Sequence, residues 1–311
     1  MRFVDAAEIK RVLTFSLLVA ELEAAHRRPR IEILDGYLGS ETEQYFVRHA
    51  VDHGRFMASK LITSFPANLA RGTLPAVQAV CVVFDGRNGR PLAVVDGTEI
   101  TYWRTAADSA LGAKLLAPPA PRTLLVVGAG QMAPWLVAAH RAVRPSLEEV
   151  LIWNRTSSRA VELASTLTRE GIAANAVVDI DEATRSADVI TACTRSHVPL
   201  IKGANLRPSV HLDLIGGYTP DTREADDEAA RRGLVFVDRR ESAFKGVGDI
   251  LQPIARGAIR ESDVLGDLYD LVGAQVRGRR SPSDITYFKN AGGAHLDLMT
   301  AEVVLAQVGI L

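Results

Sequence analysis

The sequence predicts an α/β protein with two domains, one built on a parallel sheet and one on a mainly antiparallel sheet. Beyond residue 122, short apolar runs alternate with amphipathic segments, as in a doubly wound parallel sheet with right-handed crossovers. Residues 30–104 instead contain short apolar runs separated by Gly, Asn, Asp and Pro, which is typical of antiparallel strands joined by turns. The 311 residues suffice for two domains with a large core.

The first part of the chain begins with a predicted helix. Apolar residues recur near helical spacing over residues 5–27. Strands are then expected in four runs, residues 45–49, 57–65, 76–84 and 91–97. Residues 85–90, DGRNGR, lie between the last two runs and predict a hairpin.

An Ala-rich helix is expected over residues 105–116, and the segment APPAP that follows it at 117–121 is the expected linker. The following sequence alternates strands with helices, and residues 294–308 again have helical periodicity. The expected strands of this second part are residues 124–127, 150–153, 176–178, 189–192, 211–215 and 234–237. The expected helices between the early strands are residues 132–144, 158–170 and 181–186.

The first strand of the second part runs into the glycine-rich sequence GAGQMA at residues 128–133. Gly128 permits a tight turn, Gly130 allows a pyrophosphate to approach the backbone, and Ala133 allows close packing of helix on strand. The anion would lie at the helix N-terminus, where free N–H groups and the helix dipole favour it. A Rossmann domain that binds a dinucleotide is therefore expected, with Ala129, Gln131 and Met132 completing the cofactor turn.

The end of the next strand indicates which nicotinamide cofactor is bound. An NAD site has an acidic residue there for the ribose hydroxyls, but this strand ends in Asn154, Arg155 and Thr156, with Arg159 further on. Two guanidinium groups can neutralise a 2′-phosphate, and the threonine hydroxyl can donate to it. NADPH is the expected cofactor, with NADH as a weaker alternative; a solvated surface arginine is the simpler explanation of Arg155 taken alone.

The composition excludes several classes of function. The apolar fraction of 47% and the charged fraction of 23% are ordinary for a globular protein. A net charge of −1 gives no general affinity for nucleic acids or anionic membranes. The apolar runs are shorter than a membrane span, and acidic residues interrupt the N-terminus too early for a secretory signal.

Cysteine and histidine usage adds two expectations. Cys81 and Cys193 lie in apolar runs and are expected to be buried thiols, and so few cysteines favour the reducing cytoplasm. His49 and His53 are four residues apart, but no HExxH pattern or third ligand accompanies them, so no metal site is expected.

Four motifs, in this order, resemble those of the ornithine cyclodeaminase/μ-crystallin family. They are KLITSFPAN at residues 60–68, DGTEITYWRTAA at 96–107, IGGYTPDTREAD at 215–226 and DITYFKNAG at 284–292. The resemblance implies a homodimer with a Rossmann domain at residues 117–291. It also implies an antiparallel substrate-binding and dimerisation domain built from both chain ends, residues 1–116 and 292–311.

The resemblance implies that Lys60 and Arg104 are the catalytic pair. Arg104 can grip a substrate carboxylate bidentately, and a desolvated lysine can take part in proton transfer. Taken without the resemblance, Lys60 is better explained as an edge-strand charge that prevents aggregation, and Arg104 is equally well explained as a member of a surface ion pair. The further substrate-binding candidates are Arg30, Arg48, Thr105, Gly217, Tyr218 and Gly292. The further cofactor-binding candidates are Thr194, Gly216, Lys289 and Asn290.

Departures from the family pattern narrow the expected activity. Tyr218 stands where ornithine cyclodeaminases carry an aspartate, and those enzymes use NAD with an acidic strand end. Arg48 and His49 replace a common Met-Pro, and Asn290 replaces a common serine. The chain is most similar to the family's bacterial Δ1-pyrroline-2-carboxylate (ketimine) reductases. The alternatives are a cyclodeaminase-like lyase, an alanine- or opine-type amino-acid dehydrogenase, and a non-catalytic NADPH-binding protein of the crystallin kind.

Overall fold

The computed structural model describes residues 1–40, 42–68, 72 and 74–311. Backbone contacts divide the chain into two compact units, Met1–Thr105 with Gly293–Leu311, and Ala106–Gly292. The division falls inside helix α4 (Gly97–Leu116) and not at the proline-rich segment that follows this helix. The second half of α4 belongs to the second unit because it contacts strands of that unit. Ser109 Oγ donates to Asp213 Oδ1 at 2.9 Å, and Gly112 leaves room for the ring of Phe288.

The first unit contains a sheet whose described strands follow the order β1-β6-β5-β4-β3-β2. The strands are β1 (Arg2–Val4), β2 (Glu32–Gly39), β3 (Gln44–Asp52), β4 (Phe56–Ser64), β5 (Val77–Asp85) and β6 (Pro91–Asp96). All neighbours are antiparallel except β1 and β6, and β5 and β6 form the expected hairpin. The sequence did not indicate β1, which is very short, or the edge strand β2, whose side chains are nearly all exposed and therefore show no alternation.

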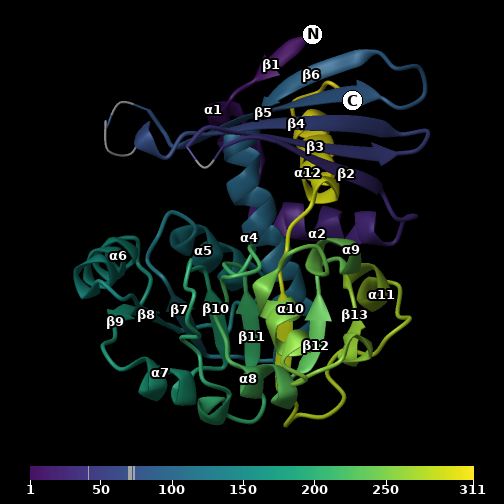
Figure 1. Ribbon diagram of the computed structural model, residues 1–311. Coiled ribbons are helices and arrows are strands. Elements are labelled where there is room, and N and C mark those ends of the chain that lie inside the picture. Colours follow the sequence, from purple (N-terminus) through teal and green to yellow (C-terminus); the bar gives the residue numbers. More distant parts are fainter. Residues whose placement is uncertain (41, 69–71, 73) are drawn as a thin grey trace. The chain divides into compact units, whose positions relative to one another are not determined.

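The first unit also contains helices α1 (Ala6–Val12), α2 (Phe15–His26) and α12 (Ala294–Gln307), together with the first half of α4. A single helix was expected over residues 5–27, but the chain breaks at Leu13 and Thr14. Thr14 Oγ1 accepts a hydrogen bond from Leu17 N at 3.2 Å and so caps a new helix. The C-terminal α12 packs against β2, β3, β4 and β5 and against α2 (Figure 1). The antiparallel domain is therefore built from both ends of the chain, as expected.

The second unit is a parallel sheet whose described strands follow the order β13-β12-β14-β11-β10-β7-β8-β9. The strands are β7 (Thr123–Val127), β8 (Glu149–Trp153), β9 (Ala174–Ala176), β10 (Val189–Ala192), β11 (His211–Leu214), β12 (Leu234–Val237), β13 (Val264–Gly266) and β14 (Thr286–Lys289). The predicted doubly wound parallel sheet is confirmed. Its order reverses beside β7, and ligands of such sheets bind beyond the carboxyl ends of the strands at this point.

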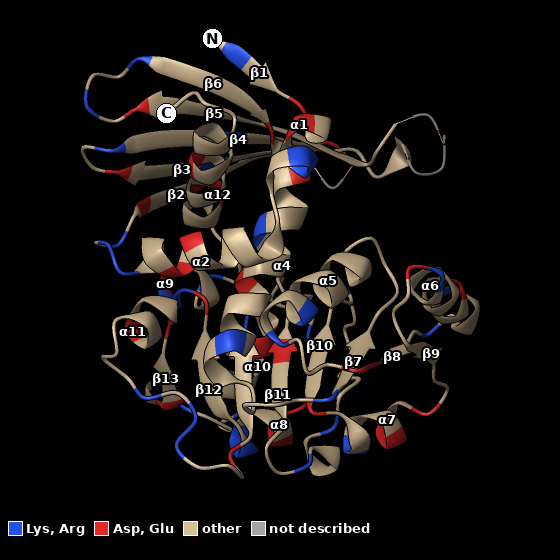
Figure 2. Ribbon diagram, turned by 180° about the vertical axis from the view of Figure 1, so that it is seen from behind, with Lys and Arg blue, Asp and Glu red and all other residues tan. Residues whose placement is uncertain are grey.

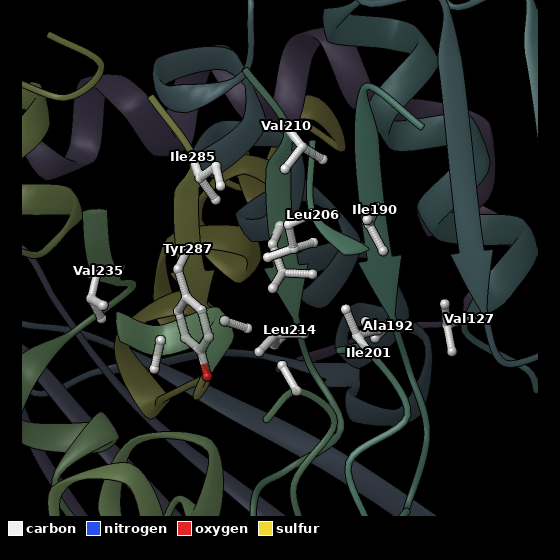
Figure 3. Close-up of a cluster of buried hydrophobic side chains, with 14 of the residues drawn as sticks. Val127, Ile190, Ala192, Ile201, Leu206, Val210, Leu214, Val235, Ile285 and Tyr287 are labelled. Carbon is white, nitrogen blue, oxygen red and sulfur yellow. The ribbon is translucent and has the colours of Figure 1, made fainter. Parts of the chain in front are cut away.

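Helices connect these strands, and apolar side chains fill the space beneath them. The helices are α5 (Ala133–Val143), α6 (Ser157–Arg169), α7 (Ile180–Ser186), α8 (Asp227–Arg232), α9 (Arg240–Ala243), α10 (Gly248–Ala255) and α11 (Leu268–Val272), with short 3₁₀ turns at Gly203–Asn205 and Glu261–Asp263. Figure 3 shows one core cluster, in which Val127, Ile190, Leu214 and Tyr287 come from four neighbouring strands. The Tyr287 hydroxyl donates to the Asp249 carbonyl at 2.8 Å, which satisfies this buried polar group.

Charged residues of both signs are interspersed through each unit (Figure 2), in keeping with the net charge of −1. In the part of the chain that the structure describes, no helix is long and apolar enough to cross a membrane.

Candidate functional site

Three charged side chains from distant segments meet in the first unit. Lys60 lies on β4, Arg104 on α4 and Asp297 on α12, and all three are buried. Lys60 Nζ donates to Asp297 Oδ1 at 2.6 Å and to Thr101 Oγ1 at 2.9 Å. Arg104 Nε lies 3.4 Å from the same Asp297 oxygen. The structure therefore brings the two predicted catalytic residues together through a carboxylate.

The strand register extends this cluster across the sheet. Arg48 on β3 pairs directly with Lys60, and Lys60 pairs with Cys81 on β5. Directly opposite residues project from the same face of a sheet. Asp35 on β2 is the next residue in this row, and its Oδ2 lies 3.7 Å from Arg48 Nε.

Burial and neighbouring charges determine the protonation states in the cluster. Burial lowers the pKa of Lys60 to about 8, with Arg104 and Arg48 also lowering it and Asp297 opposing the shift. Burial raises the pKa of the Asp297 carboxyl, but Lys60, Arg104 and Arg48 outweigh it and hold that pKa below its usual value. Lys60 is therefore mostly protonated at neutral pH and loses its proton near pH 8, whereas Asp297 stays ionised.

Sequence reasoning did not identify Asp297. The only available signal was an acidic residue inside an otherwise apolar helical pattern, because Leu296 and Leu298 on either side are fully buried. An ionised side chain in such a position needs a partner. Nothing in the sequence indicates that this partner is Lys60, which precedes it by 237 residues.

The remaining predicted substrate residues are distributed over the two units. In the first unit, Arg30 is exposed between α2 and β2, and Thr105 Oγ1 donates to the Thr101 carbonyl at 2.7 Å inside α4. Gly217, Tyr218 and Gly292 belong to the second unit. Tyr218 is 50% exposed on the loop after β11, and the Arg195 guanidinium lies 6.0 Å from its ring centroid.

Gly217 and Gly292 border buried carboxylates of the second unit. A Cβ at Gly217 would lie 2.1 Å from Asp249 Oδ2, so a larger residue would displace this buried carboxylate. Gly292 has φ 72°, a left-handed conformation that favours glycine, and its N–H donates to Asp238 Oδ2 at 2.6 Å.

The glycine-rich turn of the second unit has the geometry expected of a dinucleotide site. Gly128 adopts φ 112°, and a Cβ there would lie 3.1 Å from the Cys193 carbonyl. Nothing lies within 4 Å of a Cβ position at Gly130, so the backbone is open to a ligand on that side. Gln131 and Met132 follow, and no side chain caps α5 at Met132. These residues fit a pyrophosphate at the helix N-terminus.

The basic strand end lies beside this turn. Asn154 Oδ1 accepts from Ala129 N at 3.1 Å, so the asparagine ties the glycine-rich turn to the end of β8. Arg155, Thr156 and Arg159 are exposed, and the first turn of α6 carries no acidic residue. Two exposed guanidinium groups at an uncapped helix N-terminus can bind a phosphate.

Glu224 connects the loops that follow β10 and β11. Its Oε1 accepts from Thr194 N at 2.5 Å and from Thr194 Oγ1 at 2.8 Å. Its Oε2 accepts from Ile215 N at 3.0 Å and from Gly216 N at 2.6 Å. Burial, and next the neighbouring Asp249, raise the pKa of Glu224 to about 7. Glu224 was not among the residues predicted from the sequence, yet it holds the predicted cofactor residues Thr194 and Gly216 in place.

The last two predicted cofactor residues are buried at the end of β14. Lys289 is fully buried, and its ammonium donates to Asp249 Oδ2 at 3.1 Å, so the structure gives it a partner inside the unit. Asn290 Nδ2 donates to Ser109 Oγ at 3.0 Å, and Ser109 in turn donates to Asp213. These contacts fix the orientation of the Asn290 amide.

Two smaller expectations can also be compared with the structure. Cys81 is buried as expected, but Cys193 is only partly buried. His49 and His53 do not share a helix: His49 lies on β3 with its Nδ1 2.8 Å from Ser59 Oγ, and His53 follows that strand, 3.1 Å from Glu32. The described residues contain no group of three or more His, Cys, Asp or Glu side chains that could hold a metal ion.

Comparisons with known proteins agree on one family. The model of the ornithine cyclodeaminase/mu-crystallin family matches residues 42–309. A Delta(1)-pyrroline-2-carboxylate reductase of Paracoccus denitrificans is 44% identical over 305 residues, which cover 97% of this chain and 96% of that protein. The solved structure of Thermococcus litoralis Delta(1)-pyrroline-2-carboxylate reductase, in complex with NADH and L-proline, is 27% identical with a TM-score of 0.91 and covers 99% of this chain and 97% of that one.

A third similar protein is an archaeal alanine dehydrogenase, described as a dimer with bound NAD. It is 27% identical with a TM-score of 0.91, and the match covers 99% of this chain and 96% of that one. The family model covers well over half of the sequence, and the Paracoccus relative matches almost all of it. The chain therefore belongs to the ornithine cyclodeaminase/mu-crystallin family.

Proposed function

We propose that this protein reduces a cyclic ketimine acid with NADPH, converting Δ1-pyrroline-2-carboxylate to L-proline and the six-membered Δ1-piperideine-2-carboxylate to L-pipecolate. The observation that carries the proposal is the pair of buried cations, Lys60 and Arg104, assembled around one carboxylate. The wider class is an oxidoreductase that acts on carbon–nitrogen bonds with a nicotinamide cofactor. It follows from the reductase relatives and the cofactors bound to the similar structures.

The side chains of the first unit account for substrate binding and proton transfer. The planar guanidinium of Arg104 binds the substrate carboxylate, with Arg48 and Arg30 as further anchors and Thr105 beside Arg104. Lys60 Nζ donates a hydrogen bond to the imine nitrogen and supplies the proton that this nitrogen gains. When bound, the reduced nicotinamide supplies the hydride for carbon C2 of the imine. One hydride and one proton thus convert the C=N bond to CH–NH.

The direct test follows the absorbance of NADPH with each imine present. Oxidation of NADPH with formation of L-proline or L-pipecolate is the expected result. Ammonia release from ornithine without net cofactor change would instead identify a cyclodeaminase-like lyase. NADPH oxidation with pyruvate and ammonium would identify an amino-acid dehydrogenase. NADPH binding with no turnover of any of these compounds would indicate a non-catalytic protein.

Replacing Arg155 and Arg159 together with alanine is expected to raise the KM for NADPH by about 10- to 100-fold, as for the loss of charge-assisted hydrogen bonds to a phosphate. The KM for NADH should change little, because NADH lacks the 2′-phosphate. Steady-state kinetics with both cofactors measures the difference. Arg169→Ala, at the exposed C-terminal end of the same helix α6, is the control. Equal losses with both cofactors would contradict the assignment of NADPH.

Replacing Glu224 with glutamine is expected to raise the Kd for NADPH about tenfold, which corresponds to about 1.4 kcal/mol. The carboxylate accepts four hydrogen bonds, and a side-chain amide would turn an NH₂ group toward N–H donors. The loops carrying Thr194 and Gly216 would therefore separate. Fluorescence titration of NADPH measures the effect. Glu228→Gln is the control, because Glu228 is partly exposed and pairs with Arg231. An unchanged affinity in Glu224→Gln would show that Glu224 does not position the two loops for the cofactor.

We further propose that the protein is a homodimer with a small-molecule substrate and no nucleic-acid or membrane partner. Three large apolar side chains of the edge strand β2 support self-association, because Leu34, Tyr37 and Leu38 are 67%, 51% and 69% exposed. The described dimer of the archaeal alanine dehydrogenase also supports it. Light scattering of the purified protein measures its mass in solution, and a monomer would contradict the proposal.

A further inference from the structure

We propose that Asp297 is a positioning residue: it holds Lys60 and Arg104 in the arrangement that receives the substrate carboxylate and imine. This inference rests on the proposed ketimine reduction and deepens it. Asp297 Oδ1 contacts both cations, at 2.6 Å from Lys60 Nζ and 3.4 Å from Arg104 Nε. Two cations confined in a buried site repel each other, and a shared anion removes the repulsion.

Helix α12 holds the Asp297 carboxylate in place. Asp297 lies in the first turn of this helix, where the helix dipole favours a negative charge. The neighbouring Leu296 and Leu298 are fully buried, and the helix packs against the four strands β2 to β5. The carboxylate therefore cannot move far, and the long flexible chains of Lys60 and Arg104 adjust to it.

The strands and helices packed around Lys60 carry charged and titratable side chains, and the charge of each of these side chains can be stated. Arg48 on β3 is matched by Asp35 on β2, and on β5 burial raises the pKa of the Cys81 thiol to about 12, so Cys81 is neutral. The helices contribute Arg104, with the neutral Thr101, and Asp297. The two positive charges of Lys60 and Arg104 and the one negative charge of Asp297 sum to one net positive charge. A substrate with one carboxylate neutralises this charge.

The Asp297 charge also keeps Lys60 protonated near neutral pH. Burial, Arg104 and Arg48 all favour the neutral amine, and Asp297 is the opposing charge that limits the fall of the Lys60 pKa to about 8. If the protonated amine is required, kcat/KM of the wild type declines above about pH 8. Without the Asp297 charge, the Lys60 pKa falls further, and this decline begins at lower pH.

The experiment compares Asp297→Asn with the wild type over pH 5.5–10. The basic limb of kcat/KM is expected to move down by about one pH unit or more, which is roughly tenfold in the protonated fraction per unit. The matched control is Glu302→Gln on the same helix, where Glu302 contacts Arg28 and Arg55 instead of Lys60. In this control the basic limb should stay in place. A loss of activity by the same factor at every pH in Asp297→Asn would mean only structural support and would overturn the proposal.

A second readout needs no substrate. Competitive labelling of lysines with trace acetic anhydride across pH, measured by mass spectrometry, gives the titration of Lys60 beside the exposed Lys202. The Lys60 midpoint should fall in Asp297→Asn while that of Lys202 stays constant; an unchanged Lys60 midpoint overturns the proposal. If no ketimine is reduced by the wild type, the proposed function fails, and this labelling still decides the role of Asp297.

A third variant covers the case in which Asp297→Asn does not fold. Asp297→Glu keeps the charge but is longer by one methylene group, so it displaces both cations. The Lys60 midpoint is expected to stay near that of the wild type, while kcat/KM falls by about tenfold or more, because small misplacements in a reacting complex are costly. Wild-type kcat/KM in this variant would overturn the positioning role.

Discussion

Replacing Arg104 with lysine is expected to lower kcat/KM for the cyclic ketimine by about 100-fold or more, since disrupting a buried, hydrogen-bonded charge pair costs about 2–5 kcal/mol. Lysine keeps the positive charge, so Asp297 retains a partner and the protein should fold. What is lost is the planar fork of donors that binds a carboxylate bidentately. Initial rates against imine concentration at saturating NADPH measure the effect.

The control for this substitution is Arg55→Lys in the turn between β3 and β4. Arg55 also contacts carboxylates, Asp52 and Glu302, but it has no part in the proposed chemistry. This control should retain nearly all activity. If Arg104→Lys retained half of the wild-type kcat/KM, Arg104 would not be the carboxylate anchor.

Replacing Lys60 with methionine is expected to lower kcat by about 1000-fold near pH 7, within the usual range for loss of a general acid. Methionine fills much of the same space but can neither donate to the imine nitrogen nor carry charge. The free energy of unfolding should fall by about 3 kcal/mol, because Asp297 loses its closest cation inside the unit. Single-turnover kinetics and urea unfolding measure the two effects separately.

The affinity for NADPH should not change in this variant, because the cofactor turn at residues 128–133 belongs to the other unit. Lys202→Met is the control, since Lys202 is an exposed lysine paired with Asp181. Near-wild-type turnover by Lys60→Met would show that the proton comes from another donor. The charge of Lys60 would then matter only for stability.

Much of the fold follows from local pattern. Four of the six described strands in the first sheet lie in apolar runs that the sequence marks clearly, and so do β7, β8, β10, β11 and β12 of the second. The strand expected at residues 176–178 was misplaced, because β9 covers Ala174–Ala176, which is short and mostly exposed. The pattern failed for β2, an exposed edge strand, and for β14, which is fully buried although two of its four residues are Thr and Lys. Burial of β14 depends on partners such as Asp249 for Lys289, which local sequence cannot identify.

The candidate site likewise contains residues that could be predicted from the sequence and residues that could not. Local sequence and family motifs were enough to select the glycine-rich turn, the basic strand end, Lys60 and Arg104 as candidates, because these depend on adjacent residues or on recognisable motifs. Only the tertiary structure identified Asp297 and Glu224 as the carboxylates that organise these residues. A buried charge is stable only beside its partner, and folding brings Asp297 to a lysine 237 residues earlier in the chain.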